Sequence, residues 1–412
     1  MLSSLIQRLL NPYRGLPRTV YIQQISCLII NMGGMAKLFL PLYLHESYHV
    51  PFTWVGFMIS AYGMGALIGS YKGGSLSDRI ESSKLVRWFM TQSACCLFLL
   101  SLPIPLWLFA PVLLCAGLSD GAFRPVNQRL ALEPCPVERR PQAQGMLRVA
   151  FNLGVAISGI SGGFLAEFGF HWVYLSDAVA AMGATLWMSY AYRRFPVTLM
   201  PRSHQEGQAG PALQGPWKDL AYLRMMIGLI VAMAVFDQMY TTLGLFLRQQ
   251  YHLAPHWLGY LFTINGLMVV ILQVPIAHRI PLWGVGRCAL LGVMMCGASY
   301  LLLLLGQGPV WAILMAVAIT CGELLQSPSF VQLVMIRSEG RLRGRYMGLY
   351  SAVVGGRTLY APAIGGWVYG TFGYSVMWPG CAALSLLAVA LQFGAVRTIV
   401  SHPEATPCPA RA

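Results

Sequence analysis

The sequence predicts an all-α membrane protein with twelve transmembrane helices in two pseudo-symmetric six-helix bundles. Three observations lead to this prediction: a shortage of charge, a series of long apolar runs and an internal repeat. Of the 412 residues, 56% are hydrophobic and 10% are charged, whereas an ordinary soluble domain has roughly 25% charged residues. Because so few charges cannot cover the water-facing surface of a protein of this length, we expect most of the surface to face lipid.

Twelve apolar runs divide the chain, and each approaches the roughly 20 residues that a helix needs to cross the hydrocarbon core. We expect helices because lipid offers no hydrogen-bond partners to an open backbone. The expected spans are 18–44, 54–72, 85–104, 108–126, 145–166, 172–192, 221–247, 257–275, 286–305, 310–331, 346–369 and 375–397.

The distribution of lysine and arginine sets the expected orientation. If the N-terminus is cytoplasmic, the segments on that side carry 23 of the 28 Lys and Arg residues, and the outer loops carry one, Arg248. This is a strong positive-inside signal, so we expect both termini in the cytoplasm and the chain in the bacterial inner membrane. The net charge of +14 does not indicate nucleic acid, because the charges lie between the apolar runs and form no basic face.

The chain repeats itself with an offset of 203 residues. The stretch "LPLYLHESYHVPFTWVGFMISAYG" at 40–63 aligns without gaps with "LGLFLRQQYHLAPHWLGYLFTING" at 243–266, and 8 of 24 positions are identical. The aligned His49 and His252 suggest a shared structural role. Two homologous halves are therefore expected. The predicted parts are an N-terminal half at 1–195, a cytoplasmic linker at 196–220, a C-terminal half at 221–400 and a tail at 401–412.

A cluster of charged residues, "KGGSLSDRIESSK" at 72–84, follows the second span. It resembles the signature loop of the major facilitator superfamily, G-x-L-x-D-R-x-G-R-K, and departs from it at Glu81. The resemblance implies that Asp78 contacts the positive end of the helix of span 11 and latches the outward-facing state. Arg79 and Asp120 could form a second link. Alternatively, the cations of this loop only obey the positive-inside rule. The matching loop residues are Gly74, Leu76, Asp78, Arg79 and Lys84.

Span 5 reads "NLGVAISGISGGFL" and resembles the antiporter motif of exporters in that superfamily, although Ser158 and Gly159 replace its usual Gly-Pro. Span 11 carries a related "LYAPAIGGWVYG". The stretch "GRLRGRYMGLY" at 340–350 resembles the drug:proton antiporter branch. The resemblance thus implies export. The expected helix-packing residues are Gly154, Gly159, Gly162, Gly163, Pro362, Gly365 and Gly366.

Three ionisable residues of the second half, Asp237, Glu323 and Arg357, fall within spans, where a charge is costly and indicates function by default. The resemblance places spans 1, 4, 7 and 10 around a central cavity. A carboxylate removed from water binds a proton more readily, so Asp237 or Glu323 is expected to carry a coupling proton, modulated by Arg357. Alternatively, Arg357 and Glu323 form a static ion pair between spans 10 and 11. Tyr240 is a weaker cavity candidate.

The first half carries its own charges within spans. Lys37 either extends toward the outer interface or faces the cavity, where it would favour an anionic or zwitterionic substrate. Asp120 and Arg124 are spaced i,i+4, which favours a local ion pair on one helix face. Arg148 has the same spacing to Asn152, and we expect a scaffolding or gating role for it.

Together these features predict a proton-coupled secondary active transporter, an exporter of small amphipathic organic molecules that works by alternating access. One alternative is an exporter of an anionic metabolite or siderophore, and another is a non-transporting receptor or scaffold. No nucleophile–base spacing or phosphate loop supports an enzyme. The ten cysteines form no CxxC pair, so neither metal nor cofactor is expected. The expected partners are a small-molecule substrate, protons and membrane lipid, with the chain acting as a monomer.

Overall fold

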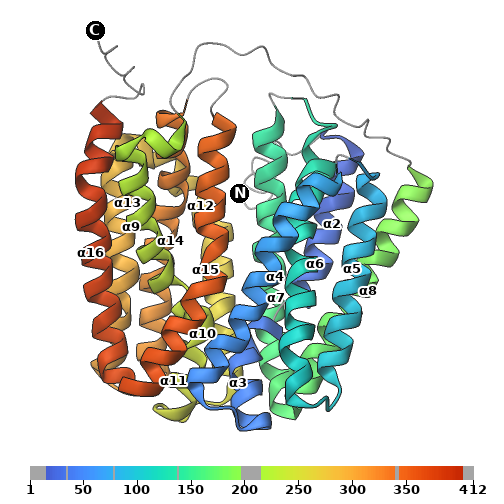
Figure 1. Ribbon diagram of the computed structural model, residues 1–412, viewed down its shortest axis with the longest axis horizontal. Coiled ribbons are helices and arrows are strands. Elements are labelled where there is room, and N and C mark those ends of the chain that lie inside the picture. Colours follow the sequence, from blue (N-terminus) through green and yellow to red (C-terminus); the bar gives the residue numbers. More distant parts are fainter. Residues whose placement is uncertain are drawn as a thin grey trace, which may run out of the picture. The chain divides into compact units, whose positions relative to one another are not determined.

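The computed structural model describes residues 15–33, 36–77, 79–136, 139–195, 215–338 and 343–401, and these residues are almost entirely helical and contain no strand (Figure 1). The helices are α2 (Arg18–Met32), α3 (Ala36–Tyr48), α4 (Phe52–Ser77), α5 (Ser82–Ser101), α6 (Leu106–Leu132), α7 (Arg140–Phe168), α8 (Phe170–Arg194), η3 (Pro216–Lys218), α9 (Leu220–Phe236), α10 (Gln238–Thr241), α11 (Leu243–Gln249), α12 (Pro255–Trp283), α13 (Val285–Ser299), η4 (Tyr300–Leu304), α14 (Pro309–Arg337), α15 (Arg343–Phe372) and α16 (Tyr374–Ser401).

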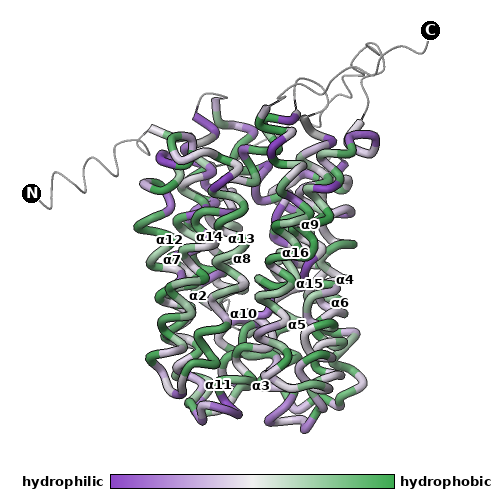
Figure 2. Tube along the Cα trace, turned by 90° about the vertical axis from the view of Figure 1, so that its left-hand side faces the viewer, coloured by the Kyte–Doolittle hydropathy of each residue, from purple (hydrophilic) through white to green (hydrophobic). Residues whose placement is uncertain are grey.

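Among the described residues, nine helical segments are long and apolar enough to cross a membrane. Three further helices, α5, α8 and α15, have 20, 25 and 30 residues, and so are also long enough to cross the hydrocarbon core. Figure 2 shows hydrophobic residues along the middle of the helices and hydrophilic residues concentrated toward their ends. The all-helical membrane fold is therefore confirmed, whereas the count of twelve spans remains a prediction.

The chain forms two compact units. Each unit combines a long part of one sequence half with one segment from the other half, namely 41–60 and 258–267. Both exchanged segments include an early part of a helix, α4 in one case and α12 in the other. The first unit consists of Met1–Leu40, Ala61–His204 and Leu258–Leu267, and the second of Pro41–Ser60, Gln205–Trp257 and Met268–Ala412.

The first unit is held together by a buried apolar cluster and by close helix contacts. The cluster joins α2, α5, α6 and α8. Small residues bring α4 and α6 together: a Cβ added at Gly65 would overlap the carbonyl oxygen of Leu114, and one at Gly117 would overlap that of Tyr62. Such contacts between small residues are how helices pack tightly where lipid removes the hydrophobic driving force.

The second unit is centred on stacked aromatic rings. The rings of Tyr300 and Trp378 lie 5.0 Å apart and are nearly parallel, at 7°. Phe246 of α11 meets Trp378 edge-on at 5.3 Å. Tyr300 and Trp378 are fully buried, and aromatic pairs of this kind contribute about 0.5–1.5 kcal/mol beyond their burial.

The internal repeat is visible in the helix bounds. The helices α4, α5, α6 and α7 start at residues 52, 82, 106 and 140, and α12, α13, α14 and α15 start at 255, 285, 309 and 343, each 203 residues later. The structure thus contains two copies of one helix pattern, as the alignment of 40–63 with 243–266 predicts.

The repeat extends to single dihedral angles. His49 and His252 have positive φ values of 54° and 53°. The following residue donates a backbone hydrogen bond of 3.1 Å to a carbonyl six positions earlier in both halves, in one case from Val50 to Leu44. A residue with positive φ commonly ends a helix, and the same geometry in both halves supports the structural role that the sequence suggests for the two histidines.

Candidate functional site

The first site lies where the seventh expected span is interrupted. The helix α9 ends at Phe236, Asp237 forms a turn with φ −69° and ψ −13°, and α10 begins at Gln238. The side-chain amide of Gln238 donates to the carbonyl oxygens of Ala234, at 2.8 Å, and Ala361, at 3.1 Å. The interruption is therefore tied to α15, which supplies Ala361.

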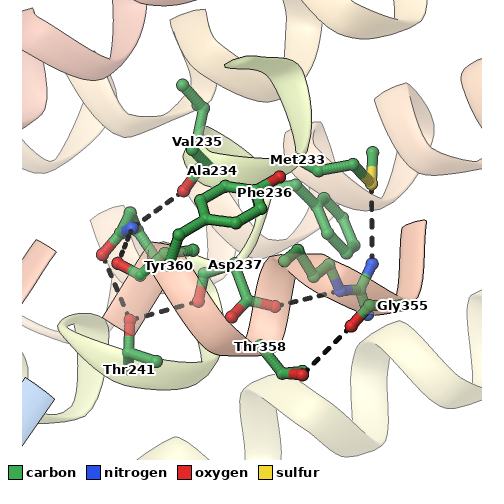
Figure 3. A network of polar contacts seen from close by, with 12 residues as sticks. Met233, Ala234, Val235, Phe236, Asp237, Thr241, Gly355, Thr358 and Tyr360 are labelled. Atoms are coloured by element: carbon green, nitrogen blue, oxygen red, sulfur yellow. Dashed lines mark hydrogen bonds and ion pairs between the residues drawn. The ribbon is translucent and has the colours of Figure 1, made fainter. Parts of the chain in front are cut away.

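An ion pair lies at this interruption. The Nε of Arg357, in α15, is 3.1 Å from Oδ1 of Asp237, whose side chain is 5% exposed (Figure 3). The guanidinium also lies 5.3 Å from the ring centre of Phe236 and 5.9 Å from that of Tyr240, within the range of cation–π attraction. A charged side chain at the centre of the bilayer costs about 3 kcal/mol on insertion scales, and these contacts offset part of that cost.

A small cavity of about 60 Å³ adjoins the ion pair, and a volume of this size can hold water molecules. Glu323 and Arg357 supply its charged walls, while Asp237 and Tyr240 are not among its lining residues. Arg357 thus borders both the cavity and the carboxylate of Asp237. The lining residues are Leu229, Met233, Phe236, Glu323, Gln326, Ser327, Phe330, Tyr350, Val354 and Arg357.

The alternative of a static pair between Arg357 and Glu323 is wrong in this structure, because the ion pair of Arg357 goes to Asp237. The reason is that α15 packs more extensively against α9 than against α14. Its guanidinium consequently reaches the end of α9, with a 3.7 Å contact to the sulfur of Met233.

A second charged site lies in the first unit. Lys37, near the start of α3, places Nζ 2.9 Å from Oδ2 of Asp120, in α6. The same oxygen accepts a 2.6 Å hydrogen bond from the hydroxyl of Tyr62 and lies 3.6 Å from a nitrogen of Arg124. Lys37 also lies 4.7 Å from the centre of the Tyr62 ring. Of the two alternatives for Lys37, extension toward the outer interface is therefore not observed.

The charged loop after α4 is only partly described. Asp78 lies outside the described residues, so its latch remains a prediction. Asp120 pairs with Lys37 and Arg124, and the suggested link to Arg79 is not formed. Asp120 lies twelve residues before the end of α6, or about 18 Å along the helix, whereas Arg79 follows the end of α4.

The remaining residues of the expected gating loop do not gather into one site. Lys84 forms an exposed 3.1 Å pair with Glu81. Gly74 lies within α4. Arg148 is exposed on α7, and its carbonyl oxygen accepts a 2.9 Å hydrogen bond from Asn152.

Several of the expected helix-packing residues lie at close helix contacts within their own units. A Cβ at Gly154 would meet Asn31 of α2, and one at Gly159 would meet the backbone of Gly259 in α12. Gly163 also lies at the contact with Gly259, and Gly162 is buried within α7.

The related helix-packing residues of α15, in the second half of the chain, pack in the same way. The carbonyl of Pro362 blocks a Cβ at Gly56 of α4. Gly365 lies against the side chain of Gln238, and Gly366 against Phe52. These residues therefore allow α15 to approach both α4 and α10 closely, as expected of a helix-packing motif.

Sequence reasoning missed a symmetry between the two sites. Asp120 and Glu323 are 203 residues apart, so they occupy the same position of the repeat, on α6 and α14. Two prolines inside these helices, Pro125 and Pro328, have the same relation. The offset found at 40–63 could have revealed this pairing if it had been followed into spans 4 and 10.

Two buried acids were also missed. Asp177 of α8 is 5% exposed and accepts a 3.0 Å hydrogen bond from the backbone N–H of Ala36. Asp219 precedes α9 and pairs with Arg337, with Nε 2.7 Å from Oδ2. Asp177 could have been found as an acid inside an apolar run, as Asp237 was. Asp219 carried no such signal, because it borders the polar linker.

Comparison with known proteins assigns this helical framework. The sequence model of the family described as Major Facilitator Superfamily matches residues 25–357. The uncharacterised MFS-type transporter YttB of Bacillus subtilis (strain 168) is 24% identical over 388 residues, which cover 91% of this chain and 94% of that protein. The multidrug resistance protein MdtH of Yersinia pestis (strain Pestoides F) is 22% identical over 309 residues, covering 73% of each chain.

Solved structures agree on the fold. A POT family transporter crystallised with 5-aminolevulinic acid superposes with a TM-score of 0.80 at 15% identity, covering 94% of this chain and 97% of that one. A mutant of the nucleoside transporter NupG gives a TM-score of 0.73 at 13% identity, covering 92% and 100%. These relatives are transporters rather than enzymes. The chain is a multi-pass integral membrane protein and belongs to the Major Facilitator Superfamily.

Proposed function

We propose that this protein is a proton-coupled secondary active transporter that exports small amphipathic organic molecules from a bacterial cytoplasm by alternating access. The observation that supports this most is the Asp237–Arg357 ion pair at an interrupted helix, next to a cavity whose wall contains a second acid, Glu323. Ionisable groups buried within membrane spans are typical of substrate and proton pathways in transporters. The similarity to MdtH, a multidrug resistance protein, supports the export direction.

The geometry suggests how a proton and a substrate would compete. While Asp237 is ionised it holds Arg357 at 3.1 Å, and the guanidinium leaves the substrate path open. Protonation of Asp237 removes the charge that holds the guanidinium. Arg357 then turns toward Glu323 on the wall of the small cavity and obstructs that path. Antiport follows, because the two ligands favour different positions of one side chain.

Burial and pairing have opposite effects on proton binding by Asp237. Removal from water favours the neutral carboxylic acid, whereas the neighbouring guanidinium favours the carboxylate. A movement of Arg357 therefore changes the proton affinity of Asp237. Either Asp237 or Glu323 carries the transported proton, and the acid whose replacement abolishes gradient-driven accumulation is the carrier.

Proteoliposomes with an imposed pH gradient test the proposal. Three fluorescent amphipathic probes share the dansyl group and represent three charge classes: dansylglycine is an anion, dansylglycinamide is neutral and dansylcadaverine is a cation. At least one should accumulate against its gradient. Asp237→Asn or Glu323→Gln should abolish gradient-driven accumulation while leaving exchange of labelled for unlabelled probe without a gradient.

Glu46→Gln is the matched control, because Glu46 also pairs with an arginine, Arg248 at 2.8 Å, but lies in the last turn of α3. This variant should keep gradient-driven accumulation. Unchanged accumulation in both Asp237→Asn and Glu323→Gln would refute the coupling site. Failure of the wild-type protein to move any of the three probes would refute the substrate class.

A further inference from the structure

Two arginines from different helices lie against one exposed aromatic ring. Arg18 is the first residue of α2, and Arg194 is the last residue of α8. The guanidinium carbon of Arg18 is 5.0 Å from the ring centre of Phe195, and that of Arg194 is 5.8 Å from the same centre, within the range of cation–π attraction. Both arginines are exposed, as is the neighbouring Arg193. A guanidinium that lies on a ring keeps the N–H donors at its edge available.

The positive charge of this arginine cluster, Arg18, Arg193 and Arg194, is not balanced by the described acids of the first unit. Two of these acids lie at the same end of the unit, where α5 begins and α6 ends. Glu81 pairs with Lys84 at 3.1 Å, and Glu133 pairs with Arg129 at 2.8 Å. The other described acids of the unit lie within helices or toward its opposite end: Asp120, Glu167 and Asp177. The cluster therefore retains its charge for an anion from outside the described chain.

An apolar stripe leads along α8 to the cluster. Val179, Leu186 and Tyr190 are 65%, 63% and 66% exposed, and Met182 is 37% exposed. Steps of three or four residues place them on one helix face, and the same step continues from Tyr190 to Arg193 and Arg194. The opposite face of α8 packs against α2 and α5, and α8 lies at the edge of its unit (Figure 1). The stripe is therefore open to lipid.

The length of the stripe matches one leaflet of a bilayer. From Val179 to Tyr190 the helix rises about 16 Å, and half of the hydrocarbon core is about 15 Å thick. Tyrosine is typical of the interface between hydrocarbon and water, so the arginines beyond Tyr190 lie at the level of the phospholipid headgroups. The apolar and the charged parts of the face thus follow the two parts of a lipid molecule.

The chemistry of the cluster selects a phosphate group. Guanidinium groups bind phosphate oxygens with two parallel N–H donors. Basic sites between membrane helices on the cytoplasmic side are suited to anionic headgroups, and the positive-inside signal predicts that the ends of α2 and α8 with the arginines are cytoplasmic. A phospholipid without net charge carries its own cation beside the phosphate, and that cation would approach the arginines.

We propose that Arg18, Arg193, Arg194 and Phe195 form a headgroup site for an anionic phospholipid. The phosphate lies between the guanidinium groups of α2 and α8, Phe195 holds these groups in place, and one acyl chain follows the stripe on α8. The site joins the first helix of the unit to its last. It does not depend on the transport function proposed above.

Native mass spectrometry of the purified full-length protein, titrated with single lipids, tests this site. Dioleoylphosphatidylglycerol should bind more tightly than dioleoylphosphatidylcholine, which has the same acyl chains. The double variant Arg18→Gln, Arg194→Gln should weaken binding of the glycerol lipid at least about tenfold, since a basic residue near the surface contributes about fivefold. Its binding of the choline lipid should not change. Arg224→Gln removes an exposed arginine near the start of α9, and this control should behave like the wild type.

A charge-conserving double variant separates a built site from general positive charge. Arg18→Lys with Arg194→Lys keeps both cations but loses the planar donors, so the glycerol lipid should bind several-fold more weakly than to the wild type. Wild-type affinity in this variant would overturn the proposal, as would equal wild-type affinity for the two lipids. Equal weakening by Arg224→Gln would also overturn it. Soluble glycerophosphoglycerol should not displace the lipid, and displacement at equal concentration would show a site for free phosphate esters instead.

Discussion

The backbone N–H of Ala36 donates a 3.0 Å hydrogen bond to Oδ2 of Asp177. Ala36 is the first residue of α3, and Asp177 belongs to α8. Both groups are buried, since Ala36 is 1% and Asp177 5% exposed, so this hydrogen bond ties α3 to α8 inside the first unit. Because Lys37 follows Ala36, Asp177 fixes the point from which Lys37 reaches Asp120.

Replacement of Asp177 should therefore lower stability. Asp177→Ala removes the acceptor and leaves the buried N–H of Ala36 without a partner, which costs about 1–3 kcal/mol. We expect a lower unfolding temperature for this variant. Asp177→Asn keeps an oxygen acceptor and should retain most of the stability. Thermal unfolding in one detergent measures the difference, and equal behaviour of the two variants would contradict this role of the hydrogen bond.

A double-mutant cycle tests whether Asp237 and Arg357 stabilise each other. Arg357→Gln leaves a buried carboxylate without its partner, and breaking a buried pair in this way costs about 3–5 kcal/mol. Asp237→Asn combined with Arg357→Gln removes both charges and should recover most of the lost stability. The measurement is the unfolding midpoint of each variant in one detergent. Additive losses would show that the two side chains act independently.

Arg357→Lys gives a sharper version of the same test. A lysine keeps the positive charge but lacks the planar group that lies against Phe236 and Tyr240 while reaching Asp237. We expect stability between that of the wild type and that of Arg357→Gln, with gradient-driven accumulation strongly reduced. Wild-type accumulation in Arg357→Lys would mean that charge alone serves the coupling step.

Much of the fold could be predicted from the sequence, because lipid imposes a simple rule on apolar runs and the repeat supplies an independent check. The ends of the helices were harder to predict. Span 8 was expected at 257–275, whereas α12 runs from Pro255 to Trp283. The reason is that the helical backbone can continue beyond the apolar stretch, where polar surroundings replace the hydrocarbon core. The exchange of 41–60 and 258–267 between the compact units depends on packing, which periodicity does not encode.

The candidate site was predictable only as a set of residues. A charge inside an apolar run identifies Asp237, Glu323, Arg357 and Lys37 as unusual, but not their partners. The partner of Arg357 is decided by the packing of α15 on α9, and the partner of Lys37 by the position of Asp120 on another helix. Local spacing suggested Asp120 with Arg124, and that contact is the longer of the two.

The pair of Asp219 and Arg337 predicts acid sensitivity. Arg337 donates to both carboxylate oxygens, at 2.7 and 3.2 Å, and the hydroxyl of Tyr346 donates at 3.1 Å. Burial alone would raise the pKa of Asp219, but the hydrogen bonds from Arg337 and from the backbone of Tyr222, with the charge of Arg337, hold that pKa below its ordinary value. Stability from this group is thus present above the unfolded pKa of about 3.9 and is lost as pH falls through the folded value.

Thermal unfolding between pH 7 and pH 3 measures this contribution. Asp219→Asn should lower stability at pH 7 by about 3 kcal/mol or more, and the gap to the wild type should narrow below pH 4. Glu81→Gln is the control, since Glu81 pairs with Lys84 on an exposed surface and such pairs contribute less than about 1 kcal/mol. A constant gap across the pH range would contradict the assignment to Asp219.

The two repeat-equivalent histidines allow a test of backbone strain without loss of a side-chain contact. His49 and His252 have φ values near +54° and exposed side chains. A left-handed backbone costs about 1–2 kcal/mol for residues with a Cβ, and a branched Cβ makes it worse. His49→Gly should therefore preserve or slightly raise stability, and His49→Val should lower it by about 1 kcal/mol or more. The same pair of changes at His252 should give the same signs, because the dihedral angles match.

His278→Val, within α12, is the control and should have a much smaller effect. Chemical unfolding in detergent measures these differences, and a loss of stability in both glycine variants would show that the imidazole rings, rather than the backbone, explain these positions.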